Sequence, residues 1–83
     1  MYYLYLLLCA DNSLYTGITD DIKNRLAVHQ SGKGSKYVRS RLPVKLIYQE
    51  EQSDKSTALK RELEVKSWSR TEKIARLGLG GVS

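Results

Sequence analysis

The sequence has little of what very small domains use as covalent or metal staples. Its 83 residues include a single cysteine, Cys9. One cysteine closes no intramolecular disulfide and supplies no set of thiolate metal ligands. We therefore expect a protein of the reducing cytoplasm. The length predicts one small domain near the lower limit of independent folding, which excludes a large core that encloses a cofactor.

The chain also lacks a long hydrophobic run. Its most apolar segment covers residues 2–10, whereas a helix needs about 20 apolar residues to cross a bilayer. No basic segment precedes this stretch as in a signal peptide. The composition, 41% hydrophobic and 28% charged, is that of an ordinary globular chain. The sequence therefore predicts a soluble, folded protein.

Acidic residues are missing between Asp21 and Glu50, so the net charge of +5 is concentrated in one segment. A field of one sign attracts polyanions. Nucleic acid is therefore the expected partner, an anionic membrane comes second, and an ordinary solvated surface is the remaining alternative. The basic residues of this window are Lys23, Arg25, Lys33, Lys36, Arg39, Arg41 and Lys45.

The residue pattern predicts a small α+β domain. Residues 2–9 and 14–18 flank Asp-Asn-Ser and are typical of a β-hairpin. Helical spacing follows from residue 20 to about Gly32, a strand covers 44–51, and two helices cover about 54–67 and the segment after Ser69. The order strand, strand, helix, strand, helix, helix predicts a three-stranded sheet with helices packed on it. We expect one domain over residues 1–77 and a flexible tail over 78–83.

Glu62 is the carboxylate that the helical pattern turns inward. It lies one turn from Ala58 and from Val65 on the apolar stripe, whereas Glu64 falls on the solvated side. A partly buried carboxylate is costly unless a cation or a metal ion compensates it. Two interpretations stay open: a metal ligand, or an inward salt bridge to Arg25 or to a lysine.

Arg25 and His29 are four residues apart and therefore share one face of the first predicted helix. Both lie beside the apolar positions Ile22 and Leu26. A guanidinium offers a planar fork to a phosphate, and an imidazole titrates near neutral pH. The alternative for His29 is a purely structural role in the core.

The hairpin register decides where the tyrosines point. A three-residue loop would pair Cys9 with Tyr15 and would keep odd-numbered residues on one face. A two-residue turn would reverse Tyr15 relative to Tyr5. Aromatic packing across the strands is the structural alternative for both tyrosines. With the longer loop, one face carries Tyr3, Tyr5, Tyr15 and Gly17.

Taken together, these residues resemble the GIY-YIG nuclease superfamily. The resemblance covers nearly the whole chain and is closest to small stand-alone bacterial proteins of the UPF0213 type. The first triplet is Tyr-Leu-Tyr instead of Gly-Ile-Tyr, and no asparagine follows Asn24, although many relatives place one after the glutamate helix. The segments that carry the resemblance are Tyr3-Leu4-Tyr5, Tyr15-Thr16-Gly17, Arg25 and Ala58-Leu59-Lys60-Arg61-Glu62.

The resemblance implies an antiparallel three-stranded sheet flanked by helices, and cleavage of a nucleic-acid phosphodiester with one divalent ion, Mg²⁺ or Mn²⁺. Glu62 would then hold the metal and Arg25 would stabilise the charge on phosphorus. The resemblance also assigns Gly17 as the motif glycine. The general base stays open among Tyr5, Tyr15 and His29.

Three functions therefore remain. The first is a metal-dependent endonuclease that acts on DNA rather than RNA, with structured or damaged DNA as candidate substrates, and without a membrane partner. The second is a nucleic-acid-binding module with weak or no cleavage, which the missing asparagine favours. The third is a small basic subunit that docks an acidic protein. The oligomeric state is left open. In the first two, the backbone-binding residues are Lys33, Lys36, Arg39, Arg41 and Lys45.

Overall fold

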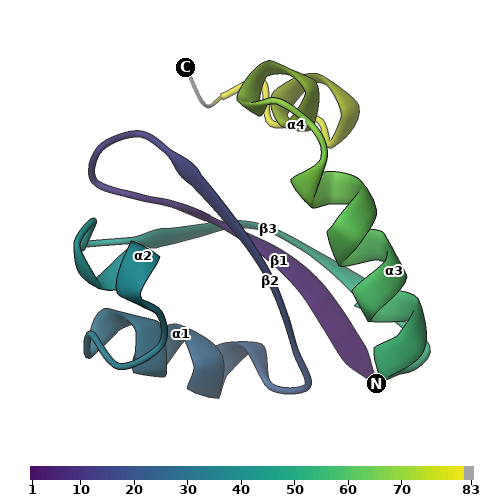
Figure 1. Ribbon diagram of the computed structural model, residues 1–83, viewed down its shortest axis with the longest axis horizontal. Helices are drawn as coiled ribbons and strands as arrows, with labels where there is room; N and C mark the ends of the chain where they lie inside the picture. Colours follow the sequence, from purple (N-terminus) through teal and green to yellow (C-terminus); the bar gives the residue numbers. More distant parts are fainter. Residues whose placement is uncertain (82–83) are drawn as a thin grey trace.

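Three strands form one antiparallel sheet in the order β2-β1-β3 (Figure 1). The computed structural model describes residues 1–81. This architecture confirms the predicted α+β fold. It adds one short helix, α2, whose few residues give no readable helical period. The elements are β1 (Tyr2–Leu8), β2 (Leu14–Thr19), α1 (Ile22–Gln30), α2 (Lys36–Arg39), β3 (Lys45–Gln52), α3 (Lys55–Lys66) and α4 (Arg70–Arg76).

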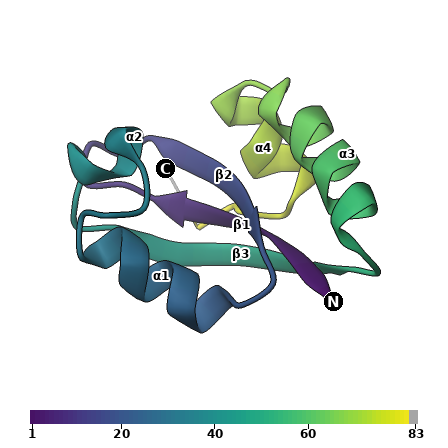
Figure 2. The same cartoon turned by 60° about the horizontal axis from the view of Figure 1, so that its bottom comes forward.

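Helices cover both faces of the sheet, because the side chains of the central strand alternate between two small cores. Leu4 and Leu6 face one core, which Val65 of α3 helps to close. Tyr5 and Leu7 face the other, together with apolar residues of α1 and α2. Figure 2 shows α1 and α2 on one side of the sheet and α3 and α4 on the other. Within residues 1–81, no helix combines the length and hydrophobicity needed to cross a bilayer.

The hairpin register differs from the predicted one by two residues. Leu7, not Cys9, is the partner of Tyr15, and Tyr5 pairs with Gly17. The loop is longer because Asp11 accepts hydrogen bonds from the amide and the hydroxyl of Ser13 and closes its own turn. A shift of two residues keeps the parity of the pairing. Odd-numbered residues therefore share one face, as the sequence predicts.

A β-bulge interrupts β3. Leu6 pairs with Tyr48, but Leu7 pairs with Leu46, so one residue of β3 is left over between them. Leu46 and Tyr48, which the alternation of a regular strand would place on one face, therefore lie on opposite faces. Leu46 packs into the core beneath α1 and α2, whereas Tyr48 packs into the opposite core. The bulge lets this one strand supply apolar side chains to both faces.

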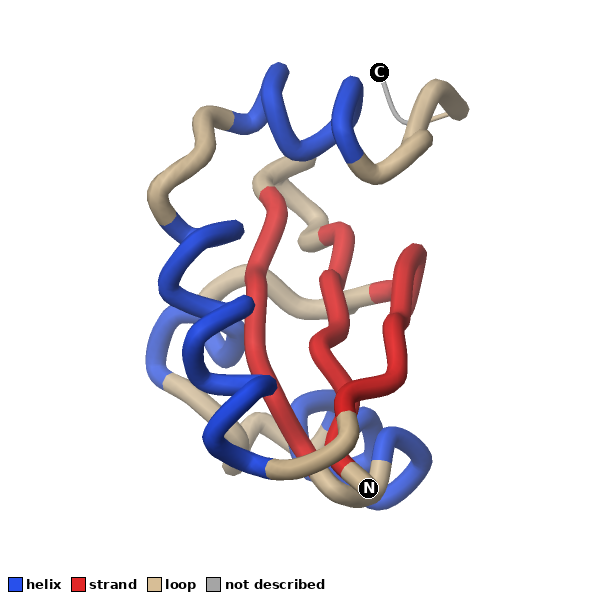
Figure 3. Tube along the Cα trace, turned by 90° about the vertical axis from the view of Figure 1, so that its right-hand side faces the viewer, coloured by secondary structure: helices blue, strands red, loops and turns tan. Residues whose placement is uncertain are grey.

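The structure corrects the expected flexible tail at Leu79. This side chain is 7% exposed and belongs to the same core as Leu4 and Val65. Its amide donates to the carbonyl of Ile74, and Gly78 before it adopts a positive φ of 69°. Figure 3 shows the chain turning back after α4, which lies across the end of α3. The remaining tail, residues 82–83, lies outside the described residues.

We predict that Gly17→Ala destabilises the protein. A Cβ at this position would lie 2.6 Å from the Tyr5 hydroxyl oxygen and 2.7 Å from the ring carbon that bears it. The ring would have to move within a packed core, which costs about 1–3 kcal/mol of unfolding free energy. Urea unfolding measures this loss.

Gly80→Ala is the matched control, because nothing lies within 4 Å of its Cβ position. Its unfolding free energy should change by less than about 0.5 kcal/mol. Equal stability of the two variants would mean that Tyr5 is free to move away from Gly17.

Candidate functional site

A buried hydrogen bond joins β1 to α1 at the centre of the site. The hydroxyl oxygen of Tyr5 lies 2.8 Å from Nε2 of His29. Tyr5 is 3% exposed and His29 is fully buried. The helix carries His29 inward because it lies on the same face as Ile22 and Leu26, which pack into this core. The two side chains therefore act as one polar unit inside an apolar layer.

The electrostatic surroundings keep both partners neutral near pH 7. Burial raises the pKa of Tyr5 to about 12, against the opposing effect of the Arg25 guanidinium. Burial, and then the positive charge of Arg25, lower the pKa of His29. In the tautomer that carries its proton on Nδ1, the imidazole accepts the hydrogen bond from the Tyr5 hydroxyl. A neutral imidazole that faces a phenol is a ready acceptor for the phenol proton.

Gly34 fixes the other side of the imidazole. A Cβ at Gly34 would collide with Nδ1 of His29. That nitrogen is buried and has no hydrogen-bond partner among residues 1–81. The loop at residues 31–35, which the sequence predicts to be flexible, therefore presses its backbone against the ring. It holds His29 toward Tyr5.

An aromatic row leads from this pair to the surface. The ring of Tyr15 lies 5.3 Å from that of His29 and 6.0 Å from that of Tyr37, measured between centroids. Tyr37 is 39% exposed. Sequence reasoning missed it, although an aromatic residue within a basic segment is a known signal of nucleic-acid binding. The row joins the buried Tyr5 to an exposed ring on α2.

Arg25 contributes a fixed cation beside the pair. It is half-buried, and its buried Nε has no hydrogen-bond partner within residues 1–81. Its charge acts on both Tyr5 and His29. A guanidinium with a free donor next to a phenol is suited to receive an anionic oxygen.

Glu62 of α3 acts on Tyr5 through its charge. Its negative charge contributes to the raised pKa of Tyr5. Its side chain is 16% exposed, and Oε2 lies 3.2 Å from Nζ of Lys66. Glu64, in contrast, is 56% exposed and pairs with Arg61 at 2.7 Å. The predicted inward orientation of Glu62 is thus confirmed, and so is the salt bridge to a lysine that the sequence allowed.

The donor set around Glu62 fits a hard divalent ion that takes most of its ligands from elsewhere. Residues 1–81 contain no group of three or more His, Cys, Asp or Glu side chains that could hold a metal ion. Mg²⁺ is commonly bound by one or two carboxylates, with water and substrate phosphate oxygens filling its shell. Glu62 therefore fits as the single protein ligand, provided that Lys66 gives way.

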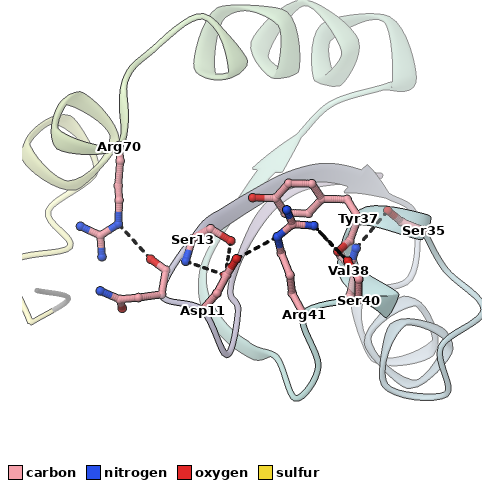
Figure 4. Close-up of polar contacts among 9 residues, drawn as sticks. Asp11, Ser13, Ser35, Tyr37, Val38, Ser40, Arg41 and Arg70 are labelled. Carbon is pink, nitrogen blue, oxygen red and sulfur yellow. Dashed lines mark hydrogen bonds and ion pairs between the residues drawn. The ribbon is translucent and has the colours of Figure 1, made fainter.

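Arg41 differs from the other basic residues of the window. Its Nε donates to Asp11 at 2.9 Å, and its guanidinium carbon lies 3.7 Å from the centroid of the Tyr37 ring (Figure 4). Arg70 holds the same hairpin loop from α4 by donating to the carbonyl of Asn12. Arg41 is therefore occupied in joining α2 to this loop. The other four residues predicted to bind the nucleic-acid backbone are exposed and form no ion pair within residues 1–81: Lys33, Lys36, Arg39 and Lys45.

We predict that stability falls as the pH is lowered through the ordinary His pKa of 6.5. The folded state holds the pKa of His29 below that value, so the unfolded chain binds a proton that the folded chain does not. Carboxylates titrate at lower pH, which leaves the range from about pH 7.5 to pH 5.5 to His29. The free energy of unfolding in urea, measured across this range, checks the prediction.

His29→Gln should flatten this pH dependence, whatever its own cost in stability. If the variant kept the wild-type slope, the slope would belong to another group, and folding would not shift the pKa of His29.

Comparisons with known proteins show the family of the chain. The family model described as the GIY-YIG catalytic domain matches residues 1–75. The UPF0213 protein of Staphylococcus haemolyticus is 51% identical over 73 residues, which cover 88% of this chain and 89% of that protein. A UPF0213 protein of Lactiplantibacillus plantarum is 55% identical over 78 residues, covering 92% and 77%.

Two solved structures are also similar. The solution NMR structure of the UPF0213 protein BH0048 from Bacillus halodurans has a TM-score of 0.61 and 42% identity, with 95% of this chain and 85% of that chain covered. The solution NMR structure of the protein EF2693 from E. faecalis has a TM-score of 0.66 and 37% identity, covering 99% and 88%. The chain therefore belongs to the GIY-YIG catalytic-domain family and to its UPF0213 branch, a membership that points to nuclease-type activity.

Proposed function

We propose that the protein is a metal-dependent endonuclease that hydrolyses phosphodiester bonds of DNA. One observation carries the proposal: the Tyr5–His29 hydrogen bond lies within the fields of both Arg25 and Glu62. Phosphodiester hydrolysis needs a base for water, a cation for the developing charge and a ligand for a metal ion. These four side chains supply each of those groups from three different elements.

Tyr5 and His29 together move the proton of the attacking water. With a pKa of about 12, Tyr5 alone is almost never deprotonated near neutral pH and is therefore rarely available as a base. Because His29 is neutral and hydrogen-bonded to it, Tyr5 can take a proton from water as it passes its own proton to Nε2. This relay favours Tyr5 over Tyr15 as the group that contacts water. Arg25 binds the phosphate oxygens on which negative charge grows.

Glu62 would hold one Mg²⁺ or Mn²⁺ ion, which supplies charge stabilisation at the phosphate when it is bound. The buried free thiol of Cys9 is compatible with a reducing compartment, and we propose the cytoplasm. The exposed basic residues of the protein would hold the DNA backbone without reading the base sequence. They are Lys33, Lys36, Arg39 and Lys45.

A nucleic-acid-binding module with weak cleavage is the second candidate. The ion pair between Glu62 and Lys66 favours it, because a paired carboxylate is a poorer metal ligand. Both candidates predict DNA binding, and metal-dependent cleavage alone separates them.

We predict that Glu62→Gln abolishes metal-dependent cleavage and leaves folding and DNA affinity nearly unchanged. The amide keeps the shape of the side chain but loses the charge that holds a divalent ion. Cleavage of linear, nicked, branched and single-stranded DNA with Mg²⁺ or Mn²⁺ measures the loss. Glu64→Gln is the matched control, since Glu64 is an exposed member of a surface ion pair. This variant should cleave DNA like the wild type.

Cleavage by Glu62→Gln at the wild-type rate would exclude Glu62 as the metal ligand. Binding without metal-dependent cleavage by the wild-type protein would establish the second candidate instead.

We also predict that Lys36→Ala and Arg39→Ala each weaken DNA binding, and that each variant does so to the same extent for DNA of unrelated sequences. Each exposed cation that neutralises a phosphate contributes about one unit to the slope of log affinity against log salt. A salt titration of DNA affinity measures this slope, which should flatten by about one unit per substitution. Cleavage at saturating DNA should fall far less than in Glu62→Gln.

Lys60→Ala removes the same charge from the outer side of α3 and serves as the control. If the salt slopes of both variants equalled the slope of Lys60→Ala, the basic segment would serve a different partner, such as an acidic protein.

A further inference from the structure

The guanidinium group of Arg41 is held in a fixed plane between α2 and the hairpin loop (Figure 4). Its Nε donates to Asp11 at 2.9 Å, and its Nη1 donates to the carbonyl of Tyr37 at 3.0 Å and to the hydroxyl of Ser40 at 3.1 Å. All N–H donors of a guanidinium lie in the plane of the group. Three hydrogen bonds to three residues therefore fix this plane and leave its two faces for other contacts.

One face of the guanidinium lies on an aromatic ring, and no second ring covers the other. The guanidinium carbon of Arg41 is 3.7 Å from the centroid of the Tyr37 ring. The other arginine–aromatic contacts within residues 1–81 are both made with Trp68. The Arg41 side chain is 32% exposed and Tyr37 is 39% exposed. The protein thus presents a flat cation at its surface, backed by an aromatic ring.

The charges around Arg41 favour a flat ligand over a phosphate. Asp11 already accepts from the edge of the guanidinium, and hydrogen bonds from Ser13 lower the pKa of this carboxyl. Asp11 therefore stays ionised and would repel a phosphate that approached the same edge. The exposed face meets no such competitor. Nucleobases stack on both guanidinium planes and aromatic rings.

Neighbouring residues supply cations for the phosphates on either side of such a base. Lys36 and Arg39 belong to the same helix as Tyr37, are exposed, and form no ion pair within residues 1–81. Tyr37 is also the outer end of the aromatic row that leads through Tyr15 to His29. A nucleotide held here would therefore lie at the border of the proposed site.

We propose that the guanidinium face of Arg41, backed by the ring of Tyr37, is a stacking platform for one unpaired base of the DNA substrate. The inference rests on the proposed function and deepens it by naming the substrate class, which is DNA with a base outside the double helix. In a paired duplex, both faces of an internal base are stacked on its neighbours. Taking a base out of that stack is least costly where the base is already unpaired.

Binding measurements without a divalent ion test the platform, because the proposed cleavage needs that ion. The affinity of the protein is measured for a fully paired duplex, for the same duplex with a one-base bulge, and for the same bulge with an abasic sugar. The bulged duplex should bind about tenfold more tightly than the paired duplex. The abasic bulge has the same backbone without a base to stack, and should lose this advantage.

Two substitutions remove the platform in different ways. Arg41→Lys keeps the charge beside Asp11 but removes the plane, and Tyr37→Leu keeps an apolar side chain but removes the ring. In both variants the preference for the bulge should fall to about twofold or less, while the affinity for the paired duplex changes little. Thermal unfolding shows that each variant is folded before it is measured.

Two matched variants serve as controls. Tyr37→Phe keeps the ring and should keep the preference for the bulge. Arg76→Lys makes the same change at an arginine that lies 4.8 Å from the ring centroid of Trp68. Its helix, α4, lies on the opposite side of the sheet from α2 (Figure 2). This variant should therefore also keep the wild-type preference.

Equal affinity of the wild type for the bulged and the paired duplex would overturn the platform. A preference that the abasic bulge retains would also overturn it, because backbone deformability would then explain the preference. So would a wild-type preference in either folded variant, Arg41→Lys or Tyr37→Leu. These results would leave the nuclease proposal intact, since Glu62→Gln tests it separately. Conversely, full cleavage by Glu62→Gln together with a lost preference in Arg41→Lys would contradict the proposed function and support the platform.

Discussion

The hydrogen bond between Tyr5 and His29 is the interaction on which the rest of the site depends. It joins the central strand to α1 inside an otherwise apolar layer. A buried polar group without a partner costs about 1–3 kcal/mol, so each of the two side chains requires the other. The pairing also underlies the proposed chemistry. Burial holds the pKa of Tyr5 high and that of His29 low, so the proton rests on the phenol in the free protein.

Two glycines make this bond possible by leaving out a side chain. Gly17 on β2 lets the hydroxyl end of the Tyr5 ring approach the backbone closely, and Gly34 lets the loop after α1 close over His29. Neither has a positive φ, so close approach, rather than backbone freedom, explains why glycine occupies both positions. The sheet and the loop therefore act as two walls that hold one hydrogen-bonded pair.

The sequence predicts those parts of the structure that depend on local period and parity. The alternation in β1, the helical spacing of Arg25 and His29, and the inward position of Glu62 all follow from residue spacing. The β3 bulge, the length of the hairpin loop and the packing of Leu79 could not be predicted in this way. Each depends on contacts between distant segments, or on a side-chain turn such as the one that Asp11 forms with Ser13.

The same limit applies to the site. Spacing brought Tyr5, Tyr15, Arg25, His29 and Glu62 into consideration, but their neighbours change what each one can do. Arg41 carries a guanidinium group that could bind a phosphate, yet in the structure this group contacts Asp11 and the ring of Tyr37. Lys66 gave no signal in the sequence, because a lysine among many lysines is conspicuous only once its ion pair with Glu62 is known.

Removing the Tyr5 hydroxyl tests the central claim most directly. Single-turnover cleavage of DNA with Mg²⁺ or Mn²⁺ is measured for Tyr5→Phe, with Tyr3→Phe as the control on the same face of the same strand. The account predicts that Tyr5→Phe cleaves about 10²- to 10⁴-fold more slowly, binds DNA as the wild type does, and loses the dependence of the rate on His29. A Tyr5→Phe protein that cleaves as fast as Tyr3→Phe would contradict it.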